Sequence, residues 1–203
     1  MIRKPLLLFP SLCLFLTLLI SAALTDPSNC TAMTDASAIL PYDASKFDPV
    51  PMPEKIPLFN VKDERSSKQV FIKMKRKMMP PVDYFRDGLQ KSIKISNAEI
   101  EDNVHELQFI MKDFHVELQR KTNAAQKDTG EITSRIEIDI ILIENNLPRE
   151  IGNYSSIAFQ EIENLSSGVA TKDIQYVIDE ALHNLFKKIF SDQYFVDSIN
   201  NVK

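Results

Sequence analysis

The sequence has few of the residues from which metal, nucleotide and catalytic sites are built. Its three histidines, His105, His115 and His183, stand in no HxH, HExxH or cysteine–histidine spacing, which argues against a metal site. Its four glycines form no phosphate-binding loop, and no serine lies in a GxSxG turn. The sequence therefore predicts a protein that is not an enzyme and that holds no cofactor.

Cysteine is also scarce, and both cysteines, Cys13 and Cys30, lie within the first thirty residues. No disulfide can hold the rest of the chain together, which must rely on a hydrophobic core instead. Cys30 is a candidate lipid or thiol site, with a free thiol, intermolecular pairing and lipidation as the alternatives. Residues 26–29 lack the aliphatic and small side chains of a bacterial lipobox, so they do not support lipidation.

An excess of positive charge is missing too, because 24 lysines and arginines against 28 acidic residues leave a net charge of −4. Nucleic acids favour basic protein surfaces, so we expect no nucleic-acid partner. Hydrophobic residues make up 44% of the chain and charged residues 26%, which is typical of a globular domain. The informative features are instead the N-terminal segment and the pattern of hydrophobic residues.

The N-terminal segment, residues 1–25, has the layout of an export signal. Basic residues at its start precede the apolar run LCLFLTLLISAAL, which contains the small residues that a signal peptidase needs. The run is also just long enough to remain in a membrane as an anchor. We expect export in either case, with membrane association through the N-terminus if the segment is retained. Residues 26–55 are rich in proline and predict an extended linker, and residues 56–203 predict a single α+β domain.

The centre of that domain is residues 104–143, which predict two long antiparallel strands joined by a polar hairpin. In the second strand alternate residues are apolar, whereas Arg135, Glu137 and Asp139 share the other face. Such alternation predicts a sheet with one buried and one solvent-exposed face. In the first strand the alternation changes phase around Lys112 and Asp113, which predicts a β-bulge.

The remaining elements complete an α+β fold. Further strands are predicted at residues 56–62, 69–74 and 150–163, and helices at residues 81–94 and 170–190. The second helix carries a continuous apolar stripe, which must pack on the buried face of the sheet. We therefore expect a two-layer sandwich in which an antiparallel sheet has two helices packed on one face.

Short motifs along about 145 residues of this domain resemble the YajG family of Gram-negative envelope lipoproteins. They are Asp63-Glu64-Arg65 after the first strand, YFRDGLQKSI in the first helix, and Ser134-Arg135-Ile136-Glu137 after the hairpin, together with residues 174–182 and 195–200 near the C-terminus. The resemblance implies a periplasm-facing domain near the outer membrane without an established enzymatic role. The missing lipobox departs from the family pattern and puts the lipid anchor in doubt.

These observations predict an exported, non-enzymatic accessory protein of the cell envelope, in the periplasm or on the periplasmic face of the outer membrane. Its partner would be an envelope protein or lipid, bound around Arg135, Glu137 and Asp139 or along a sheet edge. The alternative is a secreted ligand-binding or inhibitor-like glycoprotein of a eukaryote. That alternative draws on the N-x-[ST] sequons, which begin at Asn29, Asn153 and Asn164.

Overall fold

The computed structural model describes residues 41–66, 72–74, 77–122, 128–165 and 168–201. The chain divides into two units, residues 1–30 and 31–203, and the described residues belong to the second. The predicted export segment and the Cys30 site therefore lie outside the described residues. No helix in the described part of the chain is long and apolar enough to cross a membrane.

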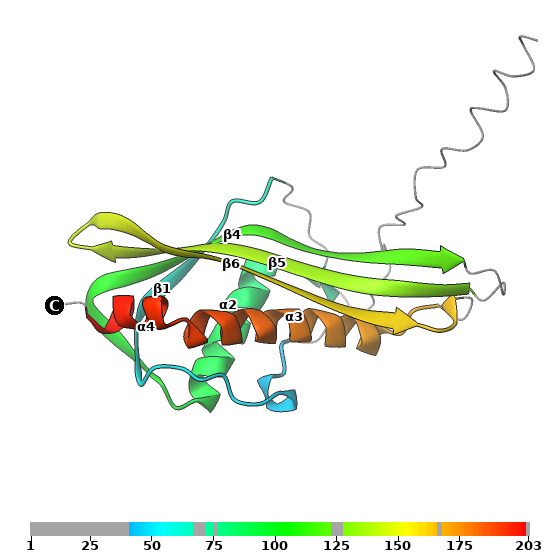
Figure 1. Ribbon diagram of the computed structural model, residues 1–203, viewed down its shortest axis with the longest axis horizontal. Coiled ribbons are helices and arrows are strands. Elements are labelled where there is room, and N and C mark those ends of the chain that lie inside the picture. Colours follow the sequence, from blue (N-terminus) through cyan, green and yellow to red (C-terminus); the bar gives the residue numbers. More distant parts are fainter. Residues whose placement is uncertain (1–40, 67–71, 75–76, 123–127, 166–167, 202–203) are drawn as a thin grey trace, which may run out of the picture. The chain divides into compact units, whose positions relative to one another are not determined.

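The domain is built on a four-stranded sheet in the order β1-β4-β5-β6 (Figure 1). Its strands are β1 (Lys55–Asp63), β4 (Glu99–Thr122), β5 (Asp128–Glu144) and β6 (Leu147–Ile162). The pairs β4–β5 and β5–β6 are antiparallel, whereas β1 and β4 are parallel. The prediction of an antiparallel sheet is thus wrong at one edge. Helix α2 (Pro81–Ile95) lies in the connection between β1 and β4, and a parallel pair requires such a crossover.

The strand predicted at residues 69–74 does not join this sheet. Its described part, β2 (Ile72–Met74), pairs with β3 (Lys77–Met79) in a separate two-stranded sheet. Alternation of side chains along so short a segment does not show which strand it pairs with, because every β-strand has a side-chain period of two, whichever sheet it joins. The neighbour of β4 at this edge of the four-stranded sheet is therefore β1.

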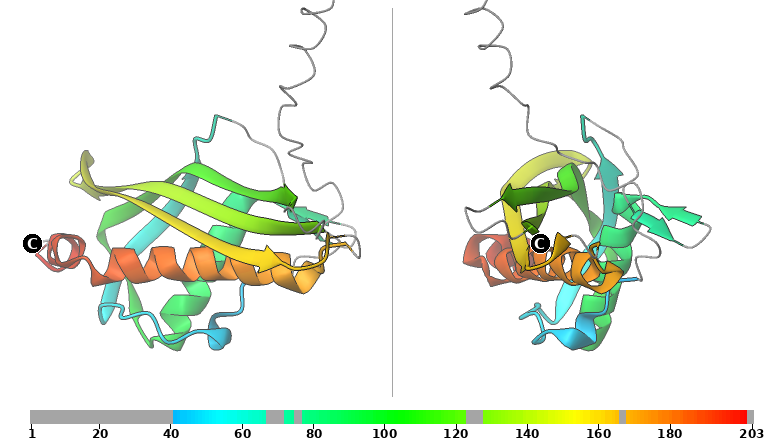
Figure 2. Two further views of the ribbon diagram at one scale, coloured as in Figure 1. Left: turned by 45° about the vertical axis from the view of Figure 1, so that its right-hand side comes forward. Right: turned by 90° about the vertical axis from the view of Figure 1, so that its right-hand side faces the viewer.

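The four-stranded sheet is curled around helix α3 (Thr171–Ser191) rather than forming one layer of a flat sandwich (Figure 2). The class α+β is confirmed, but the expected two-layer sandwich is not. The strands are up to 24 residues long, and the twist between neighbours accumulates along such lengths. The predicted bulge is present, because the register of β4 against β5 shifts between Met111 and Asp113. A bulge bends its strand and increases this twist.

The hydrophobic core lies on the concave side of the sheet. The predicted buried face of β5 is confirmed, since its alternate residues are fully buried: Ile132, Ile136, Ile138, Ile140 and Leu142. Helix α2 contributes Phe85, whose ring centre lies 5.6 Å from that of Phe109 on β4 and 5.3 Å from that of Phe186 on α3. Both helices therefore share one core with the inward-facing residues of the strands.

Helices α2 and α3 approach closely because a glycine stands at their crossing. A Cβ atom on Gly88 would lie 2.6 Å from Cδ2 of Leu182, too close for a larger side chain without rearrangement. A shorter helix, α4 (Gln193–Asn200), follows α3 and buries Phe195 and Ile199. These contacts fix the positions of α2, α3 and α4 under the sheet.

Residues 41–54, which we call the strap, run across α2 and α3 and include the turn η1 (Ala44–Lys46). Tyr42 and Val50 of the strap are buried in the core. The strap is also held by hydrogen bonds from α2 and the residue after it: Lys91 Nζ donates to the Tyr42 carbonyl at 3.0 Å, and Ser96 Oγ donates to that of Val50 at 3.0 Å. This part of the predicted linker is therefore packed on the domain.

The Asp63-Glu64-Arg65 motif forms a local turn directly after β1. The guanidinium group of Arg65 donates to both carboxylate oxygens of Asp63, with Nε–Oδ1 and Nη2–Oδ2 distances of 2.8 Å. The backbone N–H of Arg65 also donates to Asp63 Oδ1. Arg65 is buried, and bidentate pairs of this kind fix geometry as well as adding energy. The motif therefore has a structural role in this chain.

Candidate functional site

The predicted surface residues Arg135, Glu137 and Asp139 follow one another on the convex face of β5. Arg135 lies 3.1 Å from Glu137 and 3.5 Å from Asp113 on β4. Asp139 lies 3.4 Å from Lys112 and accepts a hydrogen bond of 2.6 Å from the amide of Asn153. The structure thus brings the three residues into one row of paired charges. Surface pairs contribute only about 0–1 kcal/mol each, so the row fits a polar surface better than a stability element.

Two large hydrophobic residues on β6 extend this face and were not recognised from the sequence. Ile157 is 58% exposed and Phe159 is 63% exposed. They lie opposite Arg135 and Thr133 of β5, on the same face as the predicted charges. The buried positions between and beside them are small, Ser156 and Ala158. The sequence predicted a strand at residues 150–163 but did not show which of its faces is buried, and the small residues Ser156 and Ala158 were the available signal.

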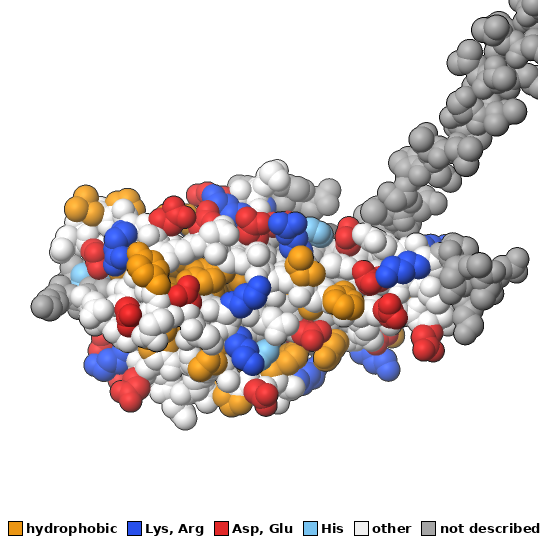
Figure 3. Space-filling view, viewed as in Figure 1, with side chains coloured by type: hydrophobic (Ala, Val, Ile, Leu, Met, Phe, Trp, Pro, Cys, Tyr) orange, Lys and Arg blue, Asp and Glu red, His pale blue; other side chains and the backbone are white. Residues whose placement is uncertain are grey.

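Strand β6 ends the sheet, because β5 is its only partner among the described strands. Lys188 of α3 donates from Nζ to the carbonyl oxygen of Ser155 at 2.7 Å, on the free side of the strand. A lysine at a sheet edge opposes pairing with another strand. In Figure 3 hydrophobic side chains and charged side chains are interspersed over this part of the domain. The edge is thus partly protected, while Ile157 and Phe159 remain accessible.

A second polar arrangement is buried between α2 and α3. The hydroxyl group of Tyr84 donates to Oδ1 of Asp179, and Gln175 Nε2 donates to the same oxygen at 2.7 Å and to the Tyr84 oxygen at 2.9 Å. Asp179 is 1% exposed, and its Oδ2 has no hydrogen-bond partner among the described residues. Burial raises the pKa of Asp179 to about 6, although the two donors oppose this change.

His183 lies one turn further along α3, beneath the strap. Its Nδ1 is 3.4 Å from the Tyr42 hydroxyl, and its ring stacks on Phe47 with 4.7 Å between ring centres. Burial lowers the pKa of His183, with a smaller contribution from Lys187. A neutral imidazole can accept the hydrogen bond from Tyr42. The strap is therefore held on α3 by an aromatic stack and a polar contact.

The three histidines occupy separate places. His105 and His115 lie on β4, where His115 pairs with Asp113 at 3.0 Å, and His183 lies on α3. Within the residues that the structure describes, no group of three or more His, Cys, Asp or Glu side chains is placed to hold a metal ion. Asp179 is 1% exposed, and the hydrogen bonds of Asp179 and Gln175 with Tyr84 join α3 to α2.

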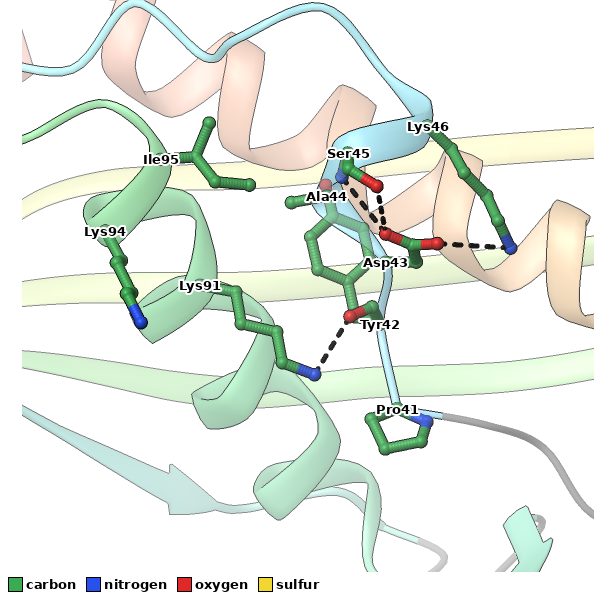
Figure 4. A pocket seen from close by; sticks show the side chains of 9 residues that line it. All are labelled: Pro41, Tyr42, Asp43, Ala44, Ser45, Lys46, Lys91, Lys94 and Ile95. Carbon is green, nitrogen blue, oxygen red and sulfur yellow. Dashed lines mark hydrogen bonds and ion pairs between the residues drawn. The ribbon is translucent and has the colours of Figure 1, made fainter.

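A hollow of about 640 Å³ lies between the strap and the last turns of α2 (Figure 4). The strap contributes residues 41–46, and α2 contributes Lys91, Lys94 and Ile95. Lys46, Lys91, Lys94 and Asp43 contribute charged residues to this lining, with apolar side chains beside them, and the side chain of Lys46 extends away from α2 past Asp43 (Figure 4). This hollow was not predicted, because nothing in the sequence shows that residues 41–46 pack against α2.

No family model and no curated protein matches the sequence. Among solved structures, the chain is similar to a minor lipoprotein from Acinetobacter baumannii, with 11% identity, a TM-score of 0.43, and coverage of 73% of this chain and 96% of that one. It is also similar to a DUF330 protein from Xanthomonas campestris, with 11% identity, a TM-score of 0.47, and coverage of 82% and 98%. Likeness at this level decides neither family nor function. The resemblance to the YajG family stays a prediction.

Proposed function

We propose that this protein is an exported, non-enzymatic accessory protein of the cell envelope, similar in role to YajG-type lipoproteins. The export-signal layout of residues 1–25 supports the location, in the periplasm or on the periplasmic face of the outer membrane. The domain binds a partner protein of the envelope through the convex face of β5 and β6. An envelope lipid is the other class of partner for this surface.

The observation that carries the proposal is the exposure of Ile157 and Phe159 beside a row of charged residues. Protein interfaces commonly have a hydrophobic centre, rich in aromatic residues, and a polar rim. Ile157 lies directly opposite Arg135, and Glu137 and Asp113 pair with that arginine. Large hydrophobic side chains that neighbour one another on a surface commonly mark an interaction site. The hydrophobic pair supplies the centre and the charges supply the rim.

Replacing Ile157 and Phe159 together with serine is expected to weaken partner binding by about tenfold or more, because truncated interface anchors typically cost more than 1 kcal/mol each. The measurement is capture of cross-linked envelope proteins by the full chain, quantified by mass spectrometry. The matched control is Leu147→Ser, since Leu147 is 72% exposed at the other end of the same strand. Equal capture by both variants and the unaltered protein would contradict the proposal.

The secreted eukaryotic glycoprotein remains the second candidate because two of its acceptor asparagines are accessible. Asn153 and Asn164 are both exposed in the structure. A glycan on Asn153 would stand on the convex face beside Asp139, to which the Asn153 amide donates. It would therefore cover part of the surface that we assign to the partner protein.

Mass spectrometry of the protein from its native source separates the two candidates. We expect an unmodified Asn153, together with an N-terminus that begins after the export segment. A glycan on Asn153 would overturn the bacterial envelope proposal, because it requires the eukaryotic secretory pathway. A diacylated Cys30 would instead support it and would establish the lipid anchor that the local residues do not predict.

A further inference from the structure

We propose that the hollow between the strap and α2 binds the phosphate group of an anionic lipid headgroup. Its lining comes from residues 41–46 and from the C-terminal part of α2, so it belongs to neither the convex face nor the buried group around Asp179. A volume of about 640 Å³ is within the range of small-molecule sites. The inference does not depend on the proposed partner protein.

The charges around the hollow favour an anion. Asp43 is its one acidic lining residue, and its carboxylate is already engaged: Oδ1 accepts from the Ser45 hydroxyl at 2.6 Å, and Oδ2 lies 3.7 Å from Lys46 Nζ. Three lysines and this one aspartate leave two positive charges in the lining. Asp87, outside the hollow, pairs with Lys91 at 2.8 Å and offsets one of them. A positive site therefore remains in a chain whose net charge is −4.

Lys94 supplies the remaining charge, because no other described group forms an ion pair or hydrogen bond with its amine. Helix α2 does not need this lysine to satisfy its last carbonyl groups. Ser96 N–H donates to the Ser92 carbonyl at 3.0 Å, Asn97 N–H to that of Lys94 at 3.3 Å, and Ala98 N–H to that of Ile93 at 3.1 Å. The helix end is thus closed by backbone bonds, and the Lys94 amine is available to a ligand.

The apolar part of the lining favours a lipid over a free phosphate ion. Pro41, Ala44 and Ile95 lie beside the lysines, and Ile95 is 43% exposed. A phosphate ion would contact only the ammonium groups, which bind phosphate as point charges. A phospholipid also brings glycerol and acyl carbons, which would cover these apolar side chains. Both candidate ligands carry a phosphate group, and the apolar lining favours the phospholipid over the free phosphate ion.

The test is a titration of the full-length protein followed by the backbone amide resonances of Ala44, Ser45 and Ile95. The ligands are glycerol phosphate, short-chain phosphatidylglycerol and short-chain phosphatidylcholine, each kept below its micelle concentration. We expect saturable shifts with phosphatidylglycerol, weaker ones with glycerol phosphate and the weakest with zwitterionic phosphatidylcholine. Stronger binding of glycerol phosphate would identify a soluble phosphate ester as the source. No saturable shift with any of the three would overturn the inference.

Lys94→Gln is expected to weaken phosphatidylglycerol binding about fivefold, since each basic residue near anionic lipid contributes about that factor. The matched control is Lys62→Gln, which changes the net charge equally at an exposed lysine outside the hollow. An unchanged circular dichroism spectrum verifies the fold of both variants. Equal weakening in both would mean non-specific attraction and would overturn the site.

Discussion

Replacing Phe186 with alanine is expected to lower the free energy of unfolding by about 3–5 kcal/mol, the largest effect that we predict for a single substitution. The Phe186 ring is fully buried on α3 and meets the rings of Phe85 on α2 and Tyr42 on the strap, with centres 5.3 Å and 6.3 Å away. One truncation therefore removes contacts among three elements. Gly88 cannot fill the space, because it has no side chain.

Urea denaturation followed by circular dichroism measures this change, and Phe159→Ala is its matched control. Phe159 is the same residue type but is 63% exposed on the convex face. Its truncation leaves no cavity and is expected to change stability by less than about 0.5 kcal/mol. If the Phe186 variant lost less than about 1 kcal/mol, the strap and the two helices would not share the core described above.

Replacing Asp179 with asparagine is expected to stabilise the protein at neutral and alkaline pH. The unfolded pKa is 3.8, and burial raises the folded pKa to about 6. Between these values the folded state binds more protons than the unfolded state, so the stability of the unaltered protein falls as pH rises through this window. Above it, ionisation of Asp179 costs about 3 kcal/mol, which asparagine does not incur. Asparagine keeps an oxygen that can accept from Tyr84 and Gln175.

The measurement compares the unfolding free energies of the two proteins from about pH 4 to about pH 8. The stability gained by the variant should grow across this range and then level off. His183, whose pKa burial lowers, is present in both proteins, so its contribution cancels in the difference. The control is Asp197→Asn, which makes the same substitution at an exposed position on α4. A pH-independent difference at Asp179 would show that its carboxylate does not titrate in this window.

The sequence predicted the strands and helices in which one face is buried along the whole element. The isoleucines of β5 alternate strictly because one side of that strand faces the core, and the bulge at Lys112 and Asp113 was visible as a change of phase. Both helices end within one residue of their predicted ends, since their apolar stripes are continuous. The regular spacing of apolar residues was therefore sufficient to predict the type and the ends of these segments.

Strand pairing, the exposed face of β6 and the buried polar group depend on which segments pack against each other. The residue pattern within one segment does not contain that information. The parallel pairing of β1 with β4 has the same alternation as an antiparallel one. Ile157 and Phe159 face solvent because α3 lies close to Ser156 and Ala158 on the other side of β6. Tyr84 and Asp179 are 95 residues apart, and each would pass alone for a surface residue of its helix. Tertiary packing decided all three cases.

The parallel pairing at the edge of the sheet also bears on the order of folding. Strand β1 is synthesised before its partner, because Lys55 pairs with Glu99, 44 residues later in the chain. Strands β4, β5 and β6 can pair as successive hairpins, which close shorter loops than the pairing of β1 with β4. We therefore expect residues 41–63 to join the sheet after those three strands have paired. The first part of the domain to be synthesised would then be the last to take its position in the fold.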